Sequence, residues 1–391
     1  MENKGSPESV PFWFDPKKRS VAAQIGTLFL VGLLSWYLIS NVLNNLEKQN
    51  IATGFGFLQK ESAFEIGESL ISYSAADTYA KALLAGVLNT VKVALIGIVL
   101  TIVLGALVGI ARLSKNWLVS RLAGSYIEVM QDIPVLLQLF FWYAIFYESL
   151  PPPRQALNPM RGVFMCNRGV MFAVPEFHAA YLYMLSAFAL GVFLSFCLKR
   201  WARKRQETTG KHFPVFKSCA LLVIGLPLIV WSAFGAPMKM NVPKFSGFNF
   251  EGGFTLSPEF MALLMGLTLY TAAFVAEVVR AGIQSVGKGQ REAAMSIGLK
   301  SGQVLTLVIL PQALRVIFPP LTSQMLNLTK NSSLAVAIGF PDFVSVANTT
   351  INQTGQSIEG VALIMIVYLF FSLATSAFMN WYNRHVAMVE R

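Results

Sequence analysis

The chain has 391 residues, of which 54% are hydrophobic and 13% are charged, and its mean hydropathy is +0.56. One water-soluble core cannot bury that much apolar surface, so the composition predicts a membrane protein. The net charge of +11 comes from 31 Lys and Arg against 20 Asp and Glu, which indicates basic cytoplasmic loops and not nucleic-acid binding. The three Cys and three His are scattered, so they predict neither a disulfide framework nor a metal site.

Eight apolar segments are expected to cross the bilayer as helices, because each can cover roughly 30 Å of hydrocarbon at about 1.5 Å per residue. They lie at 22–43, 83–110, 122–148, 179–198, 218–236, 258–283, 312–338 and 358–381. No small-residue cleavage site follows the first segment, so it is interpreted as an uncleaved membrane anchor.

Basic residues in the connecting segments predict the orientation. Residues 199–217 hold seven Lys and Arg against Glu207 alone, whereas residues 44–82 hold three Lys against five Asp and Glu. With eight spans, the N-terminus, residues 111–121, residues 199–217, the segment after the sixth span and the C-terminal tail all fall on one side of the membrane. Besides the cations of 199–217, these segments hold Lys4, Lys17, Lys18, Arg19, Arg112, Lys115, Arg121, Arg280, Lys288, Arg291, Lys300, Arg384 and Arg391. Both termini, residues 199–217 and residues 284–311 are therefore expected to be cytoplasmic.

Polar residues and prolines interrupt the third and seventh spans. Lipid cannot satisfy such groups, so they must face protein or a cavity. Helices broken at membrane depth would also offer backbone donors and acceptors to a carboxylate and an ammonium. The predicted substrate pathway comprises Asp132, Pro134, Gln138, Asn327, Lys330, Asn331, Ser332 and Ser333.

Several polar side chains in the spans allow more than one interpretation. Lys330 holds a substrate carboxylate, pairs with an acid of this chain, or extends to the membrane interface. Gln138 either lines a pore or makes an interhelical hydrogen bond. Lys92, near the outer end of the second span, is expected to extend to the interface. Glu277 and Arg280 are spaced i,i+3 and are expected to share a helix face.

No catalytic motif is present in the sequence. It contains no G-x4-G-K-[ST] phosphate loop, no H-E-x-x-H and no paired-cysteine motif. We therefore expect a non-enzymatic chain without catalytic residues, bound metal or bound cofactor, and one that does not hydrolyse ATP itself.

The segment between the sixth and seventh spans carries a spaced motif. It consists of Glu292-Ala293-Ala294, then Gly298 after three residues, then Val308-Ile309-Leu310-Pro311 after nine. Glu292 offers a charge to a partner, the paired alanines permit close helix approach, and Gly298 permits a turn with positive φ. Pro311 is expected to begin the next element. The motif resembles the EAA-x3-G-x9-I-x-L-P coupling loop of ABC-importer permeases, with Val308 in place of the usual Ile. In that family, this loop is the cytoplasmic helix through which an ATPase acts on the membrane domain.

Further blocks narrow the resemblance to the polar amino-acid uptake branch of these permeases. They are Asn89-Thr90, residues 131–140, residues 269–282 and residues 330–334, in matching order and spacing. Two extra spans inserted at about 149–255 make the chain similar to the larger permease of general L-amino-acid or glutamate/glutamine/aspartate importers. Asn331 stands where similar permeases often have an acid, which favours a broad amino-acid range.

The resemblance implies an all-α transmembrane fold of about eight helices, with a type I ABC-importer permease core and an inserted two-helix hairpin. The expected segments are 1–82, with the first span and a periplasmic loop; 83–148, the first part of the core; 149–257, the hairpin; and 258–391, the second part of the core with the coupling loop 284–311. The expected coupling residues are Glu292, Ala293, Ala294 and Gly298.

The function implied is that of a permease subunit in an ATP-driven, binding-protein-dependent importer of L-amino acids in a bacterial inner membrane. The implied partners are a homologous second permease, two copies of a cytoplasmic ATPase that uses ATP and Mg²⁺, and a periplasmic amino-acid-binding protein, but no nucleic acid. The basic residues of 199–217 are interpreted as contacts to anionic lipid headgroups in the bilayer, with ATPase docking as the second possibility. The alternatives are an ion-coupled secondary amino-acid transporter and a scaffold without a pathway.

Overall fold

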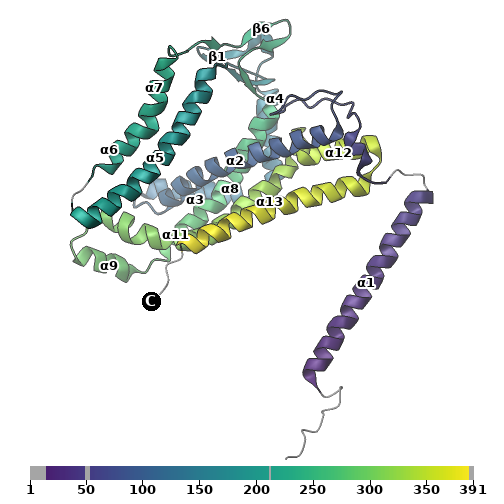
Figure 1. Cartoon of the computed structure of the whole chain (residues 1–391), viewed down its shortest axis with the longest axis horizontal. Helices are drawn as coiled ribbons and strands as arrows, with labels where there is room; N and C mark the ends of the chain where they lie inside the picture. The colour runs from purple at the N-terminus through teal and green to yellow at the C-terminus, as the bar shows by residue number, and fades with distance from the viewer. Residues whose placement is uncertain (1–14, 49–52, 211–212, 387–391) are drawn as a thin grey trace, which may run out of the picture. The chain divides into compact units, whose positions relative to one another are not determined.

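The computed structural model describes residues 15–48, 53–210 and 213–386 (Figure 1). Its α-helices are α1 Pro16–Lys48, α2 Tyr79–Arg112, α3 Trp117–Asp132, α4 Val135–Glu148, α5 Ala179–Thr209, α6 Val215–Ala220, α7 Leu226–Ala233, α8 Pro258–Gln284, α9 Lys288–Ser296, α10 Ser301–Gln303, α11 Leu310–Asn331, α12 Phe343–Thr354 and α13 Ser357–Val386. Short 3-10 helices lie at η2 Phe55–Gln59, η3 Pro153–Gln155 and η6 Ser332–Ile338, and π-helical segments at η4 Leu221–Gly225 and η5 Val304–Ile309. The strands are β1 Leu157–Met160, β2 Val163–Cys166, β3 Gly169–Phe172, β4 Val174–Pro175, β5 Met240–Asn241, β6 Lys244–Ser246, β7 Asn249–Glu251 and β8 Phe254–Leu256.

Every predicted span falls on helical structure. Within the described ranges, seven helices are long and apolar enough to cross a membrane, and an eighth span results if α3 and α4 are taken together. The predicted cations Lys4, Lys211 and Arg391, and both chain termini, lie outside the described residues.

The third span is not one helix, because α3 and α4 meet at an angle of 104°. Pro134 lacks a backbone N–H, and its ring disfavours the helical conformation in the preceding residue. Ile133 accordingly has an extended backbone with φ −88° and ψ 125°. The expectation of an interrupted third span is confirmed, and the interruption is a sharp bend.

The helices and strands form two compact units, one comprising Val93–Phe340 and the other the described parts of Met1–Lys92 and Pro341–Arg391. In the first unit, α8 is the central helix and packs against α3, α4 and α11. One buried cluster there joins Leu139 of α4 to Phe260 and Leu267 of α8, and a second joins Val275 of α8 to Ile317 of α11.

Glycines allow α2 to approach α8 closely inside this unit. A Cβ atom at Gly105 would lie 2.5 Å from Val275 Cγ1, and one at Gly109 would lie 2.6 Å from the Ala276 carbonyl oxygen. Small residues at such positions let membrane helices pack backbone to backbone, where lipid provides no hydrophobic driving force.

The inserted hairpin consists of α5 on one side and α6, η4 and α7 on the other (Figure 1). Ser195 Oγ lies 3.5 Å from the Cys219 carbonyl oxygen, and the rings of Tyr183 and Phe234 stack with centroids 5.1 Å apart. Residues 199–217 were expected to form a loop, but α5 continues to Thr209 and ends at the left-handed Gly210. Most of their cations therefore lie on an extension of a membrane helix.

Strands not anticipated from the sequence close the hairpin at the end opposite its basic extension. β1, β2, β3 and β8 form an antiparallel sheet in that order, and β4–β5 and β6–β7 form two further pairs. We call these strands and their connections, residues 157–175 and 240–256, the β-module. The rings of Phe164 and Phe250 join two of its sheets with centroids 4.7 Å apart. The insertion is therefore a helical hairpin with a β-module, and the chain as a whole is mainly helical.

The seventh span is continuous from Ser301 to Ile338. Pro311 was expected to begin an element, and it lies in the first turn of α11, which follows the π-helical segment η5 without a break. Local π geometry accommodates a residue that cannot donate a helical hydrogen bond. The expected break at Asn327 and Lys330 is absent: both lie in α11, which narrows to the 3-10 helix η6 only at Ser332.

In the second unit, the segment before α2 is fastened to that helix by buried polar contacts. Asn89 Nδ2 donates to the carbonyl oxygens of Glu68 at 2.7 Å and Pro341 at 2.9 Å. Lys92 forms an ion pair with Glu68, and their side chains are only 11% and 16% exposed. The expectation that Lys92 extends to the membrane interface is wrong, because Lys92 is held by Glu68 of the preceding loop.

Candidate functional site

The short helix α9 carries the predicted coupling residues. Glu292 and Ala293 are exposed, whereas Ala294 is buried and only 5% exposed. The helix packs against the π-helical segment η5 at the start of the seventh span. One face of α9 is thus packed against the start of a membrane-spanning helix, and the other is exposed.

Gly298 ends α9 in a Schellman motif. Its φ is +87°, its N–H donates to the Met295 carbonyl at 3.0 Å, and the Leu299 N–H donates to the Ala294 carbonyl at 3.3 Å. A side chain in this left-handed conformation is strained, so glycine is the residue that closes the helix without cost. The predicted positive φ at Gly298 is confirmed.

Two apolar side chains beside Glu292 were not predicted as part of this site. Met295 is 44% exposed and Ile297 is 79% exposed, although both lie in or directly after α9. An exposed carboxylate next to exposed apolar side chains suits a protein partner better than water. The sequence signal was the apolar residue immediately before the capping glycine.

The end of α8 is braced directly before this helix. Arg280 Nε donates to Glu277 Oε2 at 2.9 Å, a second guanidinium nitrogen binds the other carboxylate oxygen, and Arg280 Nη1 donates to Gln284 Oε1 at 2.6 Å. The predicted shared helix face of Glu277 and Arg280 is confirmed. Both side chains are partly exposed, so the pair orients the helix end more than it stabilises the fold.

The predicted pathway residues of the third span lie at the bend between α3 and α4. Asp132 is the last residue of α3 and is exposed, and Pro134 directly precedes α4. Gln138 is buried, and its Nε2 donates to the carbonyl oxygens of Met130 and Ile133, both at 3.0 Å. These bonds cross the bend inside the predicted third span: the Gln138 amide group satisfies carbonyls that the bend leaves without helical partners.

The pathway residues of the seventh span lie where α11 becomes η6. Asn327 and Lys330 are exposed, and Asn331 is half-buried. Ser332 Oγ donates to the Thr329 carbonyl at 2.8 Å, and Ser333 Oγ donates to the Lys330 carbonyl at 2.7 Å, so both hydroxyls serve the local backbone. Among the described residues, no hydrogen bond or ion pair joins this set to the set at the α3–α4 bend.

Asp342 is a buried acid that was not identified from the sequence. Its Oδ1 accepts from the Ser345 N–H at 2.9 Å and so caps α12, and Tyr368 Oη lies 3.5 Å from its Oδ2. Burial raises the pKa of Asp342 to about 7, against the lowering effect of these hydrogen bonds. The signal was an Asp two residues after Gly339-Phe340, directly before an amphipathic helix.

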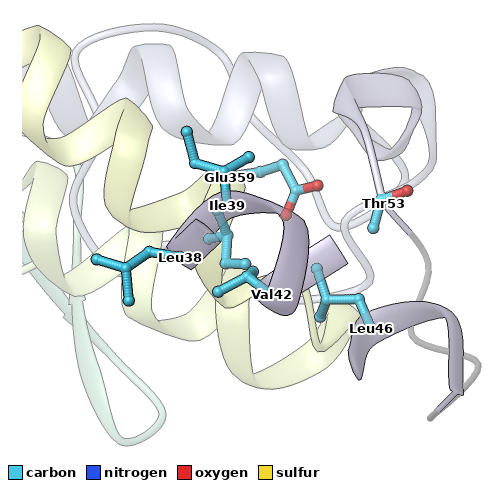
Figure 2. Close-up of a pocket in the computed structure, with 7 residues that line it drawn as sticks. Leu38, Ile39, Val42, Leu46, Thr53 and Glu359 are labelled. Carbon is cyan, nitrogen blue, oxygen red and sulfur yellow. The ribbon is translucent and has the colours of Figure 1, made fainter. Parts of the chain in front are cut away.

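A cavity of about 410 Å³ lies between α1 and the start of α13 in the second unit (Figure 2). Glu359 is the one charged residue that lines it, and its Oε1 accepts from the Gly54 N–H at 2.5 Å. The other lining residues are Leu38, Ile39, Val42, Leu46, Thr53 and Ile358. None of the predicted pathway residues lines this cavity, and its apolar walls offer little to a zwitterion.

The comparisons with known proteins agree with this architecture. The family model described as "Binding-protein-dependent transport system inner membrane component" matches residues 214–388. The general L-amino acid transport system permease protein AapQ of Rhizobium johnstonii is 47% identical over 378 residues, which cover 97% of this chain and 94% of that protein. The glutamate/glutamine/aspartate/asparagine transport system permease protein BztB of Rhodobacter capsulatus is 38% identical, with 97% and 96% covered.

Among solved structures, one of an amino acid ABC transporter with histidines aligns with a TM-score of 0.47 at 20% identity, covering 78% of this chain and 95% of that one. The near-complete coverage at 47% identity includes the helical hairpin, the β-module and the α9 segment together. The chain therefore belongs to the inner-membrane components of binding-protein-dependent transport systems, in the polar amino-acid uptake branch of the ABC-importer permeases.

Proposed function

We propose that this chain is a permease subunit of an ATP-driven importer of L-amino acids with broad specificity. The observation that carries the proposal is α9, a capped helix between two membrane spans with Glu292, Met295 and Ile297 exposed. Relatives of nearly full-length similarity are named for general L-amino acids and for glutamate, glutamine, aspartate and asparagine, which supports a range of substrates and not a single one. Membership of the permease family sets aside the ion-coupled alternative.

The partners follow from what this chain lacks. It has no phosphate loop, so a separate ATPase uses ATP and Mg²⁺. Two copies of this ATPase bind on the cytoplasmic side of the membrane. One strain of Escherichia coli has two glutamate/aspartate import permease proteins, GltJ and GltK, that both match this chain, which supports a homologous second permease as its partner. A soluble periplasmic protein delivers the amino acid.

The proposed location is a bacterial inner membrane, with both termini and α9 in the cytoplasm and the β-module in the periplasm. The basic extension of α5 and the cations around α9 support this orientation. The proposed segments remain 1–82, 83–148, 149–257 and 258–391, with 83–148 and 258–391 as the permease core.

In the proposed mechanism, ATP binding closes the two ATPases, and each α9 moves with the ATPase that holds it. Because α9 is fixed to the seventh span, this movement changes the membrane cavity from inward-facing to outward-facing. The amino acid passes the α3–α4 bend and the end of α11, where Asp132, Pro134, Gln138, Asn327, Lys330, Asn331, Ser332 and Ser333 form the proposed pathway. Binding and geometry suffice, so no covalent intermediate forms.

The test is uptake into proteoliposomes that contain the complete complex. Amino-acid uptake should require ATP on the α9 side and the binding protein on the other, and an ion gradient without ATP should drive none. Glu292→Lys should abolish uptake at normal membrane abundance, because it reverses the charge offered to the ATPase. Glu207→Lys, at an exposed position on α5, is the matched control and should transport normally. Gradient-driven uptake without ATP would contradict the proposal.

A further inference from the structure

The β-module must lie in water beyond the membrane. Its strands β1 and β8 are the edges of an open sheet, and β6–β7 is a two-stranded pair with further open edges. Hydrocarbon cannot satisfy the free N–H and C=O groups of such edges, so this part of the insertion projects from the bilayer. It adjoins the start of α8, whose 27 residues extend about 40 Å to the α9 end.

An arginine and an exposed aromatic ring meet at the tip of this module. Phe248, in the β6–β7 turn, is 76% exposed, and the Arg154 guanidinium lies over its ring at 5.5 Å. Arg154 belongs to η3, so the contact joins two separate parts of the insertion. Phe250 packs against both Phe164 and Phe245 and holds the β6–β7 pair in place. The turn that carries the exposed Phe248 ring is therefore held in place by the packing of Phe250.

The part of the insertion outside its helices is basic. Arg161 and Arg168, in the turns on either side of β2, and Lys244 on β6 are all exposed. Residues 149–177 and 235–257 together hold five Lys and Arg against two Glu. One of those acids, Glu176, already pairs with Lys239 at 2.8 Å, and the other, Glu251, lies opposite Lys244 in the β6–β7 register. The non-helical part of the insertion thus carries a net positive charge as well as an exposed ring.

We propose that the patch formed by Arg154 and Phe248, in this basic part of the insertion, docks an acidic surface of the soluble protein that delivers the substrate. Arginine and aromatic side chains dominate the energetic centres of protein interfaces, and a surrounding positive field accelerates the approach of an acidic partner. The inference rests on the proposed function, since it assigns the docking of the delivering protein to the inserted module.

The experiment measures binding of the purified delivering protein to the complete transporter in nanodiscs. Arg154→Ala and Phe248→Ala should each raise Kd at least about tenfold, the loss typical of a central interface residue. Raising salt should weaken binding to the native transporter more than binding to a transporter with Arg154→Glu. The matched controls are Lys239→Ala and Phe177→Ala, because Lys239 and Phe177 are both 81% exposed and adjoin the β4–β5 pair. Both controls should bind normally.

An unchanged Kd in both Arg154→Ala and Phe248→Ala would overturn the inference and leave the proposed function intact. A loss seen only in nanodiscs of anionic lipid, and absent in zwitterionic lipid, would assign the patch to the membrane surface and would also overturn it. If the delivering protein fails to bind the native transporter and fails to stimulate its ATPase activity, the proposed function itself is wrong. Variants are compared at equal abundance and equal thermal stability of the complex.

Discussion

Single residues in this chain act mainly by completing the hydrogen bonds of helix ends. Gly298 closes α9, Gln138 binds the last carbonyls of α3, and Asp342 caps α12. Residue identity is most restricted at such ends, because four backbone groups at each helix terminus lack a helical partner. The sequence alone identified Gly298 through a spaced motif. It left two roles open for Gln138 and missed Asp342, because a capping role depends on where neighbouring helices stop.

Gly298→Ala should reduce uptake without preventing membrane insertion. Alanine in the left-handed conformation costs about 1 kcal/mol, so the cap opens and α9 loses its defined end. The measurement is the initial rate of ATP-dependent uptake at equal membrane abundance. Gly302→Ala is the control, because Gly302 is helical and has open space around it. Equal rates in the two variants would show that the cap is dispensable.

Asp342 should make the stability of the protein depend on pH. Its pKa is raised to about 7 in the folded protein, from an ordinary value near 3.8, so between these values the folded state binds more protons than the unfolded state. Its contribution is therefore fully present below about pH 4 and is lost as pH rises through 7. The thermal unfolding midpoint of the purified complex, measured across this range, should fall less with rising pH in Asp342→Asn than in the native protein. Parallel pH profiles would rule out this role for Asp342.

At the scale of elements, prolines and polar residues determine where the apolar helices deviate from straight α-helix. The span bends by 104° at Pro134, whereas the helix continues through Pro311 because the segment before it has π-helical geometry. The same residue type therefore gives two outcomes, since Pro134 follows the end of α3 and Pro311 lies inside a continuous helix. Hydropathy predicted the spans because twenty consecutive apolar residues give a strong signal. Strands of two to four residues in the β-module give almost none.

The ion pair between Lys92 and Glu68 should fasten the loop before α2 to that helix. Lys92→Met removes the cation that faces the largely buried Glu68 carboxylate, and removing one member of a fully buried pair costs about 3–5 kcal/mol, which is the upper bound here. Thermal unfolding of the purified complex should show this loss, and adding Glu68→Gln should recover part of it. As a comparison, Lys81→Met removes a more exposed pair with Asp77, at 2.9 Å, and should cost much less. A double variant no more stable than Lys92→Met would exclude coupling between the two side chains.

For the whole molecule, composition predicted the class and the number of spans, and charge gave the proposed side of each loop. They did not predict the β-module or the length of α5, because both lie outside the apolar segments that hydropathy detects. The pathway also stays a proposal. The proposed second permease would form the other half of its walls.

The proposed topology predicts opposite labelling of two single cysteines. Thr208→Cys, near the end of the α5 extension, should react from the cytoplasmic side, and Glu65→Cys, in the exposed loop before α2, should react from the periplasmic side. The background is a variant without Cys166, Cys197 and Cys219. A membrane-impermeant maleimide added to intact and to opened spheroplasts gives the answer. Reaction of both cysteines from one side would refute the eight-span arrangement.

The helix α8 has no proline after its first residue, and most of its length is buried. It leaves the β-module at one end and enters the α9 segment at the other. A helix of this kind has no joint at which a displacement can be absorbed, in contrast to the hinged pair α3 and α4. A displacement at either end of α8 is therefore transmitted to its other end, and in the proposed orientation this single helix connects the periplasmic and cytoplasmic sides of the transporter.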